Sequence, residues 1–220
     1  MNVLFIGNSY TYYNDMPSLF EQLAMDNQKE VTVYSVTKGG RKLLDYTDAT
    51  DETTMELDAL LEQHTFDVCF VQEQSLLPAT DFSRFMEGLD HTVNKLKGRI
   101  GSLILYATWG RKECSTALET HNWTTQSMAQ LLADAYQTAA KRYDACVSPV
   151  GLRFLTVTQA HPEVDLYNQD KSHPSYQGSC LAALTHYYTL FGDFPKNTDS
   201  LSLSKDELAV FKSVVCQSYF

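Results

Sequence analysis

The chain has 220 residues, of which 44% are hydrophobic and 20% are charged, and its formal net charge is −10. This length fits a single ordinary domain over residues 1–220, with enough apolar side chains to build a core. The composition excludes a disordered or collagen-like chain. The negative charge, with no Lys/Arg-rich run, excludes nucleic acid as a partner.

Features at the beginning of the chain and its cysteines bear on the compartment. Residues 1–7 have the pattern of a buried strand and lack the basic region of a signal peptide. No apolar run approaches the roughly 20 residues that cross a bilayer. The cysteines are odd in number and widely spaced, with no CxxC pair: Cys69, Cys114, Cys146, Cys180 and Cys216. We expect a soluble cytoplasmic protein with free thiols, no membrane partner and no metal site, although a chain trimmed at a signal cleavage site would also begin at a strand.

Short apolar runs alternate with amphipathic stretches along the chain, which predicts βαβ units around a parallel sheet. The runs are short and apolar enough to be strands buried on both faces. They cover residues 2–7, 31–36, 66–71, 102–108 and, more weakly, 145–150. Five such strands are enough for an α/β fold with helices on both faces of the sheet.

The helix candidates lie between and after these strands. Asp15 is placed to cap a helix that has Pro17 in its first turn, and residues 82–96 carry an apolar stripe of helical period. A longer helix is predicted over residues 123–143, and another ends near residue 191. Ser204 and Glu207 have the spacing of a capping box, which predicts a C-terminal helix.

The first candidate functional segment is Gly7-Asn8-Ser9-Tyr10, directly after the first strand. A serine at the carboxyl end of a parallel strand can present its hydroxyl in a crevice where backbone amides also point. This position makes Ser9 a candidate nucleophile. Taken alone, Gly-Asn-Ser is also ordinary turn and helix-capping chemistry.

The second candidate segment is Asp170-Lys171-Ser172-His173-Pro174, near the other end of the chain. A serine hydroxyl needs a base within hydrogen-bond reach, and imidazole has a suitable pKa. A carboxylate on the same loop can hold that imidazole in one tautomer and stabilise its cation. His173 is therefore the candidate base and Asp170 the candidate orienting acid, whereas the alternative is a turn followed by a capping Ser175.

Together the two segments resemble the first and last sequence blocks of the SGNH/GDSL hydrolases. The resemblance extends from Gly7 to His173, although the family usually has Gly-Asp-Ser in its first block. It implies a flavodoxin-like three-layer α/β/α sandwich with a central parallel sheet of about five strands. It also implies a serine esterase that needs no cofactor, with Ser9 as nucleophile and Asp170 and His173 completing a catalytic triad. Asn8 replaces a residue that is not the nucleophile.

The resemblance further implies an oxyanion hole built from three donors. In the family these are the backbone N–H of the serine, a glycine after the second strand and an asparagine after the third. Here the first two fall on Ser9 and on Gly40, with Gly39 as the other possibility. The third strand is followed by Gln-Glu-Gln-Ser instead of the usual Gly-x-Asn-Asp, so we expect Gln74, or else Gln72, to supply the amide. This departure marks an outlying branch.

Aromatic residues near the candidate site bear on the substrate. Tyr10, Tyr12 and Tyr13 follow the nucleophile, and Trp109 ends the fourth strand. Sugars stack on such rings, so we expect Tyr10 and Trp109 to contact a short-chain ester, an acetyl ester in particular, on a carbohydrate or another small molecule. The alternative is that these rings belong to the core or the rim.

The polar segment over residues 110–122 follows the fourth strand and contains Arg111, Lys112, Glu113 and His121. Loops at the carboxyl ends of parallel strands are where ligands bind, so this one is a candidate for shaping specificity. An ordinary exposed loop would have the same composition.

Three other functions remain open from the sequence. The segment at Ser9 would allow a flavodoxin-like domain that binds phosphate, although no glycine-rich loop with a lysine is present. The unusual third block would allow a weak or inactive relative that binds carbohydrate without cleaving it. The same triad would also serve an acyltransferase.

Overall fold

The central sheet of the computed structural model, which describes residues 1–219, has five parallel strands in the order β2-β1-β3-β4-β5. They are β1 (Asn2–Gly7), β2 (Thr32–Thr37), β3 (Phe66–Val71), β4 (Ile100–Tyr106) and β5 (Cys146–Ser148). In register, Leu4 of β1 lies opposite Tyr34 of β2 on one side and Cys69 of β3 on the other. This is the flavodoxin-like strand order, which confirms the predicted fold class.

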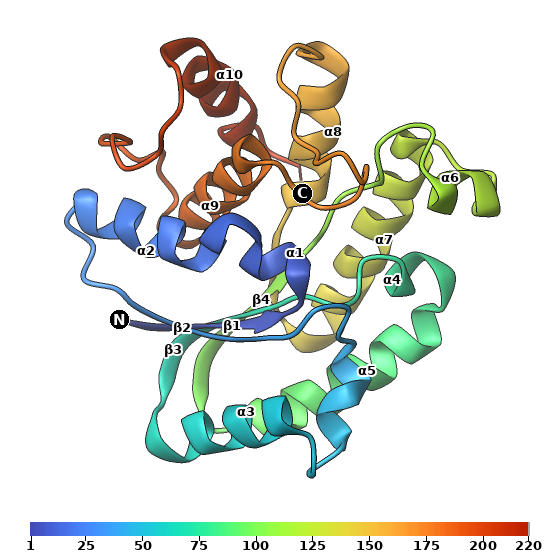
Figure 1. The fold of residues 1–220 in the computed structure, drawn as a ribbon. Helices are drawn as coiled ribbons and strands as arrows, with labels where there is room; N and C mark the ends of the chain where they lie inside the picture. The colour runs from blue at the N-terminus through green and yellow to red at the C-terminus, as the bar shows by residue number, and fades with distance from the viewer. Residues whose placement is uncertain (220) are drawn as a thin grey trace.

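Two layers of helices cover the sheet (Figure 1). One layer packs on the face that carries Val3, Phe5 and Phe70, and the other on the face that carries Leu4, Ile6 and Cys69. The first layer contains α2 (Met16–Asp26), α8 (Val150–Ala160), α9 (Tyr176–Phe191) and α10 (Lys205–Val215). The second contains α3 (Glu52–Gln63), α5 (Phe82–Leu96) and α7 (Thr125–Tyr143).

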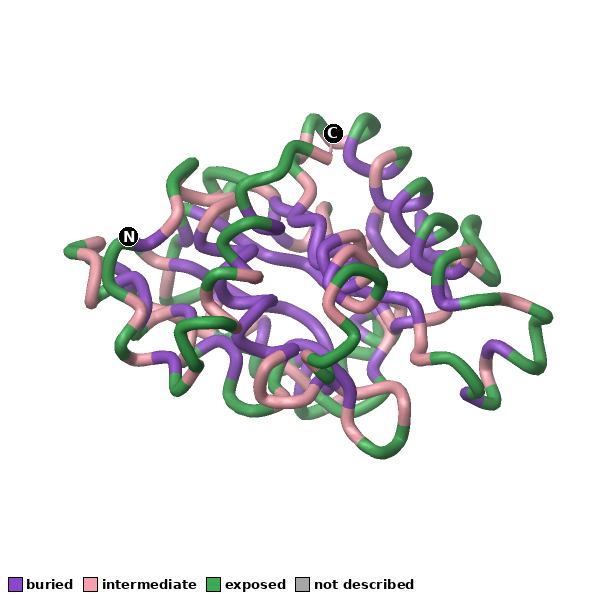
Figure 2. The backbone as a smooth tube through the Cα atoms, turned by 90° about the horizontal axis from the view of Figure 1, so that it is seen from above, coloured by how far each residue is buried: buried purple, intermediate pink, exposed green. Residues whose placement is uncertain are grey.

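Short helical turns complete the chain. They are α1 (Ser9–Tyr12), η1 (Tyr13–Asp15), η2 (Leu43–Thr47), α4 (Leu77–Thr80) and α6 (Thr116–His121). Burial follows the layers: the central strands run through the buried interior and the outer loops are exposed (Figure 2). In residues 1–219 we find no helix that combines the length and the apolar character needed to span a membrane.

Strand positions were predicted to within a few residues. β2 lies one residue later than expected, and β4 begins two residues earlier because Ile100 pairs with Phe66. The prediction of a strand to residue 150 was wrong, since β5 ends at Ser148 and α8 begins at Val150. Gly151 lets the first turn of α8 pack closely on the loop after β4, because an added Cβ would lie 2.0 Å from the carbonyl oxygen of Thr108.

The helices were predicted less completely. The helix after Asp15 and the capping box at Ser204 are both present, but the predicted cap at Asp15 was wrong in its mechanism. Asp15 precedes α2 in a left-handed conformation (φ 54°) and its side chain makes no capping hydrogen bond. α3 and α8 were not predicted, which matters little for the site because neither supplies a side chain to it.

Candidate active site

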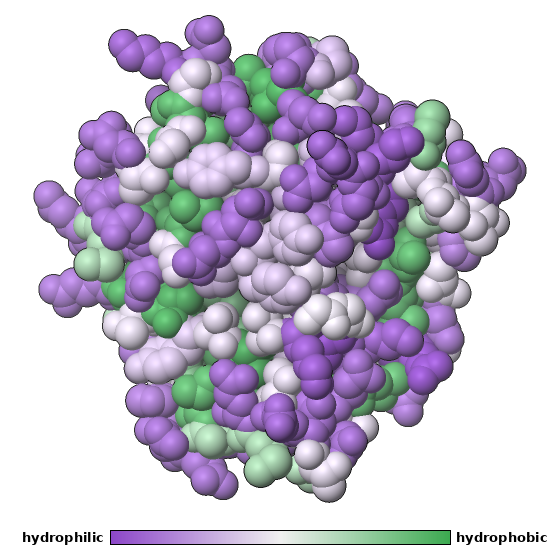
Figure 3. Space-filling model, viewed as in Figure 1, coloured by the Kyte–Doolittle hydropathy of each residue, from purple (hydrophilic) through white to green (hydrophobic). Residues whose placement is uncertain are grey.

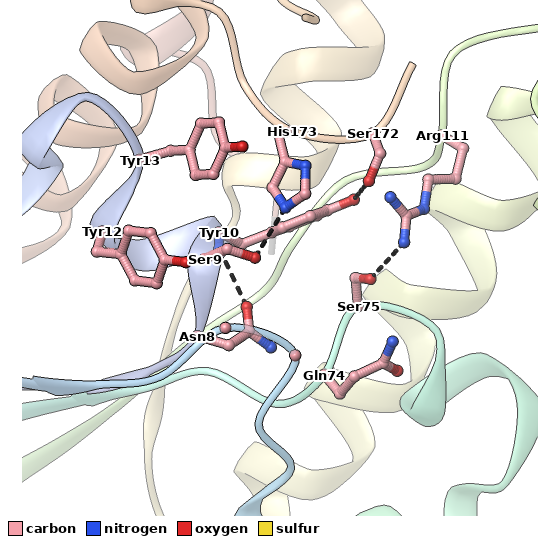
Figure 4. A pocket seen from close by; sticks show the side chains of 12 residues that line it. Asn8, Ser9, Tyr10, Tyr12, Tyr13, Gln74, Ser75, Arg111, Ser172 and His173 are labelled. Atoms are coloured by element: carbon pink, nitrogen blue, oxygen red, sulfur yellow. Dashed lines mark hydrogen bonds between the residues drawn. The ribbon is translucent and has the colours of Figure 1, made fainter. Parts of the chain in front are cut away.

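The three predicted triad residues lie together at the carboxyl edge of the sheet. Figure 4 shows two of them, Ser9 and His173, with the hydrogen bond between them. The hydroxyl Oγ of Ser9 is 2.8 Å from Nε2 of His173, and Nδ1 of His173 is 2.5 Å from Oδ2 of Asp170. A carboxylate beside Nδ1 requires a proton on that nitrogen, which leaves Nε2 free to accept the Ser9 proton. This arrangement can activate a serine for attack on a carbonyl carbon.

Ser9 is placed by the turn between β1 and α1. It is the first residue of α1, and Asn8 caps this short helix by accepting the N–H of Tyr10 at 3.0 Å. The backbone N–H of Asn8 donates to Gln72 after β3 at 2.8 Å, and its side-chain amide donates to the carbonyl of Arg41 at 3.1 Å. Asn8 therefore joins the loops that follow the first three strands of the chain.

Gly7 is required at the end of β1 for steric reasons. A Cβ added there would lie 2.3 Å from Oγ1 of Thr11 and 2.5 Å from Oε1 of Gln72. Both contacts are too close for non-bonded atoms, so a side chain at this position would push the turn away from the neighbouring loop. The glycine of the first sequence block is thus explained by packing.

The imidazole of His173 is held between two tyrosine rings. Tyr13 stacks on it with ring centroids 4.2 Å apart and planes 10° apart, and Tyr10 meets it edge-on at 5.6 Å. Stacking of this kind restricts rotation of the imidazole without using its nitrogen atoms. Both nitrogens therefore stay available for Ser9 and Asp170.

Asn14 connects the segment around Ser9 to the histidine loop, which we define as residues 161–175 between α8 and α9. Its backbone is left-handed (φ 52°), and its side-chain amide donates to the carbonyl of Pro174 at 3.2 Å and to Ser179 Oγ at 2.9 Å. The same amide donates to the carbonyl of Ser175 at 3.1 Å. The kink at Asn14 is thus tied directly to the segment after His173, about 160 residues further along the chain.

The histidine loop is fixed on its other side as well. The N–H of Asn168 donates to the carbonyl of His173 at 2.9 Å, and an antiparallel bridge pairs Tyr167 with Pro174. The indole N–H of Trp109 donates to the carbonyl of Ser172 at 3.0 Å. The backbone on both sides of the base is therefore held by the loop after β4 and by the loop itself.

Asp170 is stabilised as a carboxylate. Its Oδ1 accepts the backbone N–H groups of Ser172 and His173, each at 3.0 Å. Partial burial acts to raise the pKa of Asp170, but the hydrogen bonds from the His173 side chain and from these two backbone groups outweigh it and lower the pKa overall. Asp170 is thus charged at neutral pH and suited to stabilise an imidazolium.

A cavity of about 330 Å³ opens in front of Ser9 and His173. It is lined by Asn8, Ser9, Tyr10, Tyr12, Tyr13, Gly39, Gly40, Gln74, Ser75, Arg111, Ser172 and His173. Arg111 is the one lysine or arginine in this lining, and no carboxylate belongs to it. Within residues 1–219 no group of three or more His, Cys, Asp or Glu side chains is arranged to hold a metal ion.

No protein-family model and no curated protein matches the sequence. Among solved structures, a candidate SGNH hydrolase from Slackia heliotrinireducens is 26% identical with a TM-score of 0.76, and the match covers 86% of this chain and 98% of that one. A DUF4886 family protein from Bacteroides uniformis is 18% identical, with a TM-score of 0.80 and coverage of 98% and 93%. The acetylxylan esterase Axe2 from Geobacillus stearothermophilus is 12% identical, with a TM-score of 0.62 and coverage of 92% and 94%.

The chain is similar to the SGNH/GDSL hydrolases. The similarity covers nearly the whole of a structure of that class at 26% identity, and the sheet order agrees with it.

Two of the predicted oxyanion donors have backbone N–H groups that are free to act. Among the described residues, neither the N–H of Ser9, at the start of α1, nor that of Gly40 has a hydrogen-bond acceptor. Gly40 adopts a left-handed backbone (φ 69°), which glycine does without strain. Gly39 lines the cavity as well, beneath the hydroxyl of Tyr12.

Gln72 and Gln74, in the loop after β3, differ in their hydrogen bonds. The carbonyl oxygen of Gln74 accepts the N–H groups of Leu76 and Leu77 at 3.0 and 3.1 Å, which orients its amide and leaves the NH₂ group as a donor beside the cavity. Gln72 is fully engaged, because its oxygen accepts from Asn8 and Thr11 and its NH₂ group donates to the carbonyl of Glu73. The structure therefore rules out Gln72 and keeps Gln74 as the candidate.

The two aromatic residues predicted to bind substrate also differ in burial. Tyr10 lines the cavity but is only 3% exposed, with its hydroxyl 3.0 Å from Ser172 Oγ. Trp109 is completely buried, stacked between Tyr10 and Phe154, and lies outside the cavity lining. Direct contact of Trp109 with a substrate was therefore a wrong prediction, since the ring supports the site from beneath.

Sequence reasoning did not anticipate Glu73. This buried side chain accepts the N–H of Gln74 at 2.5 Å and that of Leu43 at 3.2 Å on the same oxygen. It thereby joins the loops after β2 and β3, which carry Gly40 and Gln74. Burial raises the pKa of Glu73 to about 7. A carboxylic acid between two short apolar stretches gives no local sign of such a role.

Proposed function

We propose that the protein is an esterase that hydrolyses short-chain carboxylic esters, acetyl esters first, through an acyl-enzyme on Ser9. The observation that carries this proposal is the continuous set of hydrogen bonds from Ser9 Oγ through His173 to Asp170, at 2.8 and 2.5 Å. The Ser9–His173 distance is within the reach that a general base needs for proton transfer.

The first half-reaction forms the acyl-enzyme. As Ser9 Oγ bonds to the ester carbonyl carbon, its proton moves to Nε2 of His173, and the carbonyl electron pair moves onto oxygen. In this proposal the backbone N–H groups of Ser9 and Gly40, with the side-chain amide of Gln74, stabilise that oxyanion. When the intermediate collapses, the bond to the alcohol oxygen breaks and the alcohol leaves with the proton from Nε2.

The second half-reaction returns the free enzyme. His173 removes a proton from water, whose oxygen bonds to the acyl carbon. Collapse of this second intermediate releases the carboxylic acid and returns the proton to Ser9 Oγ. Asp170 keeps its charge throughout and stabilises the imidazolium in both steps.

The size of the cavity supports a small substrate. Its volume of about 330 Å³ is at the lower end of small-molecule sites. On the face shown in Figure 3, apolar residues form small separate patches rather than the broad apolar surface that docking on a lipid aggregate would need. A short acyl group fits this site better than a long chain does.

The polar and aromatic lining supports a hydroxylated alcohol half, such as a sugar. Asn8, Gln74, Ser75 and Ser172 bring hydrogen-bonding groups to the cavity, and Tyr12, 40% exposed, lies at its rim. Axe2, one of the structural neighbours, is named an acetylxylan esterase. An acetylated carbohydrate or polyol is therefore the substrate class we propose for testing.

The direct test is hydrolysis of 4-nitrophenyl acetate and butyrate by the wild type, Ser9→Ala and His173→Ala. We expect acetate to be the better substrate and each substitution to lower kcat by about 10³-fold or more, because nucleophile and base act as a unit. A fluorophosphonate should label the wild type at Ser9, as shown by mass spectrometry of the peptide.

Circular dichroism of each variant controls for folding. Hydrolysis that persists unchanged in folded Ser9→Ala would contradict the proposal. Adding glycerol as a competing acceptor separates the two uses of the acyl-enzyme: a hydrolase continues to release mainly acetate, whereas an acyltransferase releases mainly the glycerol ester.

A further inference from the structure

Arg111 brings a positive charge into the cavity in front of Ser9. It follows β4 by a few residues and lines the cavity together with Ser75, Ser172 and His173. Figure 4 shows its guanidinium group pointing toward Ser75, on the opposite side of the cavity from Tyr12 and Tyr13. The group also lies 5.3 Å above the ring of Tyr10, which restricts where it can move.

The guanidinium of Arg111 has no anionic partner among the described residues. Its one side-chain hydrogen bond is donated to Ser75 Oγ at 2.9 Å, and its Nε is buried without an acceptor. The neighbouring cation, Lys112, is paired with Asp165 at 2.7 Å. The hydroxyl of Ser75 is neutral and balances none of the charge of Arg111.

Arg41 shows how this chain treats an arginine that serves the fold. Arg41 lies behind the Gly40 turn, where it forms an ion pair with Asp51 at 2.6 Å and donates to Thr54. A partly buried guanidinium without such a partner is costly unless something else compensates its charge. In Arg111 the uncompensated charge faces the space that the substrate enters.

Neutral donors surround the guanidinium. The hydroxyl of Ser75 accepts from Arg111 and also interacts with the Tyr10 side chain, and the NH₂ group of Gln74 lies beside the same part of the cavity. A planar fork of N–H groups with additional donors matches a carboxylate, which takes two parallel hydrogen bonds. The molecule as a whole has a net charge of −10 and repels anions, whereas this part of the cavity attracts them.

We propose that Arg111 and Ser75 form a subsite for a carboxylate carried by the alcohol half of the ester. The inference rests on the proposed esterase function, since a short acyl group such as acetyl has no charge of its own. The substrate class is then the acetyl ester of a hydroxy acid or of an acidic sugar. Arg111 acts in recognition, whereas Ser9, His173 and Asp170 carry the bond changes.

The kinetic test compares 3-acetoxybenzoate with its methyl ester, which present the same acetyl group with and without a carboxylate. We expect the wild type to favour the anion in kcat/KM by about 10-fold or more, the size of a charge-assisted hydrogen bond. In Arg111→Gln this ratio should fall to near one, mainly through a higher KM. In Arg111→Lys, which keeps the charge but loses the fork, the ratio should be intermediate.

Lys112→Gln is the matched control, because it removes the same charge from the next residue, outside the cavity lining. Its ratio for the two esters should equal that of the wild type. A wild type that does not favour the anion, or a ratio that falls as much in Lys112→Gln as in Arg111→Gln, would overturn the subsite.

A binding measurement separates failure of this subsite from failure of the esterase function. In Ser9→Ala, calorimetric titration should show 3-acetoxybenzoate binding about 10-fold more tightly than its methyl ester, and adding Arg111→Gln should remove the difference. If this holds while the wild type hydrolyses no ester, the esterase proposal is wrong and the anion site stands. Equal binding of the two compounds to Ser9→Ala would reject the anion site whatever the hydrolysis assay shows.

Discussion

The histidine loop and the loop after β3 lie on the same cavity but are built in different ways. The histidine loop is partly exposed and carries Asp170 and His173, whose side chains face one another directly. The loop after β3 is buried at Gln72 and Glu73, whose side chains are occupied in joining loops. A base and its acid must be particular side chains, whereas an N–H donor can come from several places. This explains why the first loop keeps the family pattern and the second departs from it.

If the two loops differ in this way, the largest loss of activity is expected on substitution of Asp170. Asp170→Asn should lower kcat for 4-nitrophenyl acetate by about 10³–10⁴-fold, measured at saturating substrate. An amide that keeps accepting the two backbone N–H groups presents its NH₂ to Nδ1 of His173. The imidazole proton then moves to Nε2, which can no longer accept from Ser9.

The matched control lies on the same loop. Asp165 accepts the N–H of Tyr167 at 3.1 Å and pairs with Lys112, without contacting His173. Asp165→Asn should therefore change kcat by less than about 3-fold, a size typical of surface substitutions. Comparable losses in the two variants would mean that the loop needs its carboxylates for folding rather than for catalysis.

A smaller effect, on stability, is expected at Glu73. Between pH 4.5, its ordinary pKa, and about 7, its folded value, the unfolded chain has lost this proton while the folded chain keeps it. The free energy of unfolding should thus decrease as pH rises through this range, by about 3 kcal/mol from this group. Glu73→Gln should abolish that part of the decrease.

Urea unfolding at pH 5 and pH 7.5 measures the free energy of unfolding of Glu73→Gln and of the wild type. Contributions to its pH dependence that both proteins share cancel in the difference. An identical pH dependence in the two would show that Glu73 is not buried as a neutral acid. At pH 5 the variant should be close to the wild type in stability, because the glutamine oxygen can accept from Leu43 and Gln74 as the protonated acid does.

The smallest effect is expected at Asn14, which connects the two ends of the chain. Asn14→Ala loses three hydrogen bonds and places an alanine in a left-handed backbone, so we expect a loss of about 2–3 kcal/mol. Asn14→Gly loses the same hydrogen bonds without the backbone strain. Its loss of stability should therefore be about 1 kcal/mol smaller than that of Asn14→Ala. Urea midpoints of the two variants give this difference; equal values would show that the kink relaxes.

The sequence was sufficient to predict the fold class and to select the residues that now lie together as Ser9, Asp170 and His173; their catalytic roles stay a prediction. The strands were recognisable because strands buried on both faces are continuous apolar runs. Ser9 was recognisable because its place after such a run, together with a distant Asp-x-x-His, is a rare combination. Both signals are local in sequence.

The parts that sequence could not supply depend on long-range contacts. Tyr13 covers His173 only because the backbone turns at Asn14, and that turn is stabilised by groups about 160 residues away. Arg111 was visible as a charged loop residue, but its lack of an acidic partner is a property of the folded molecule. Gln72 and Gln74 were indistinguishable by type, and only their hydrogen bonds separate them.

The burial of Trp109 gives the protein an optical reporter of its own. The chain has two tryptophans. Trp109 is fully buried and its indole N–H donates a hydrogen bond to the carbonyl of Ser172, next to His173. Trp123 is partly exposed and stacks on His121. The emission of a buried indole lies at shorter wavelength than that of a hydrated one. Fluorescence of Trp109 therefore follows the integrity of the histidine loop without any added dye, separately from the rate of ester cleavage.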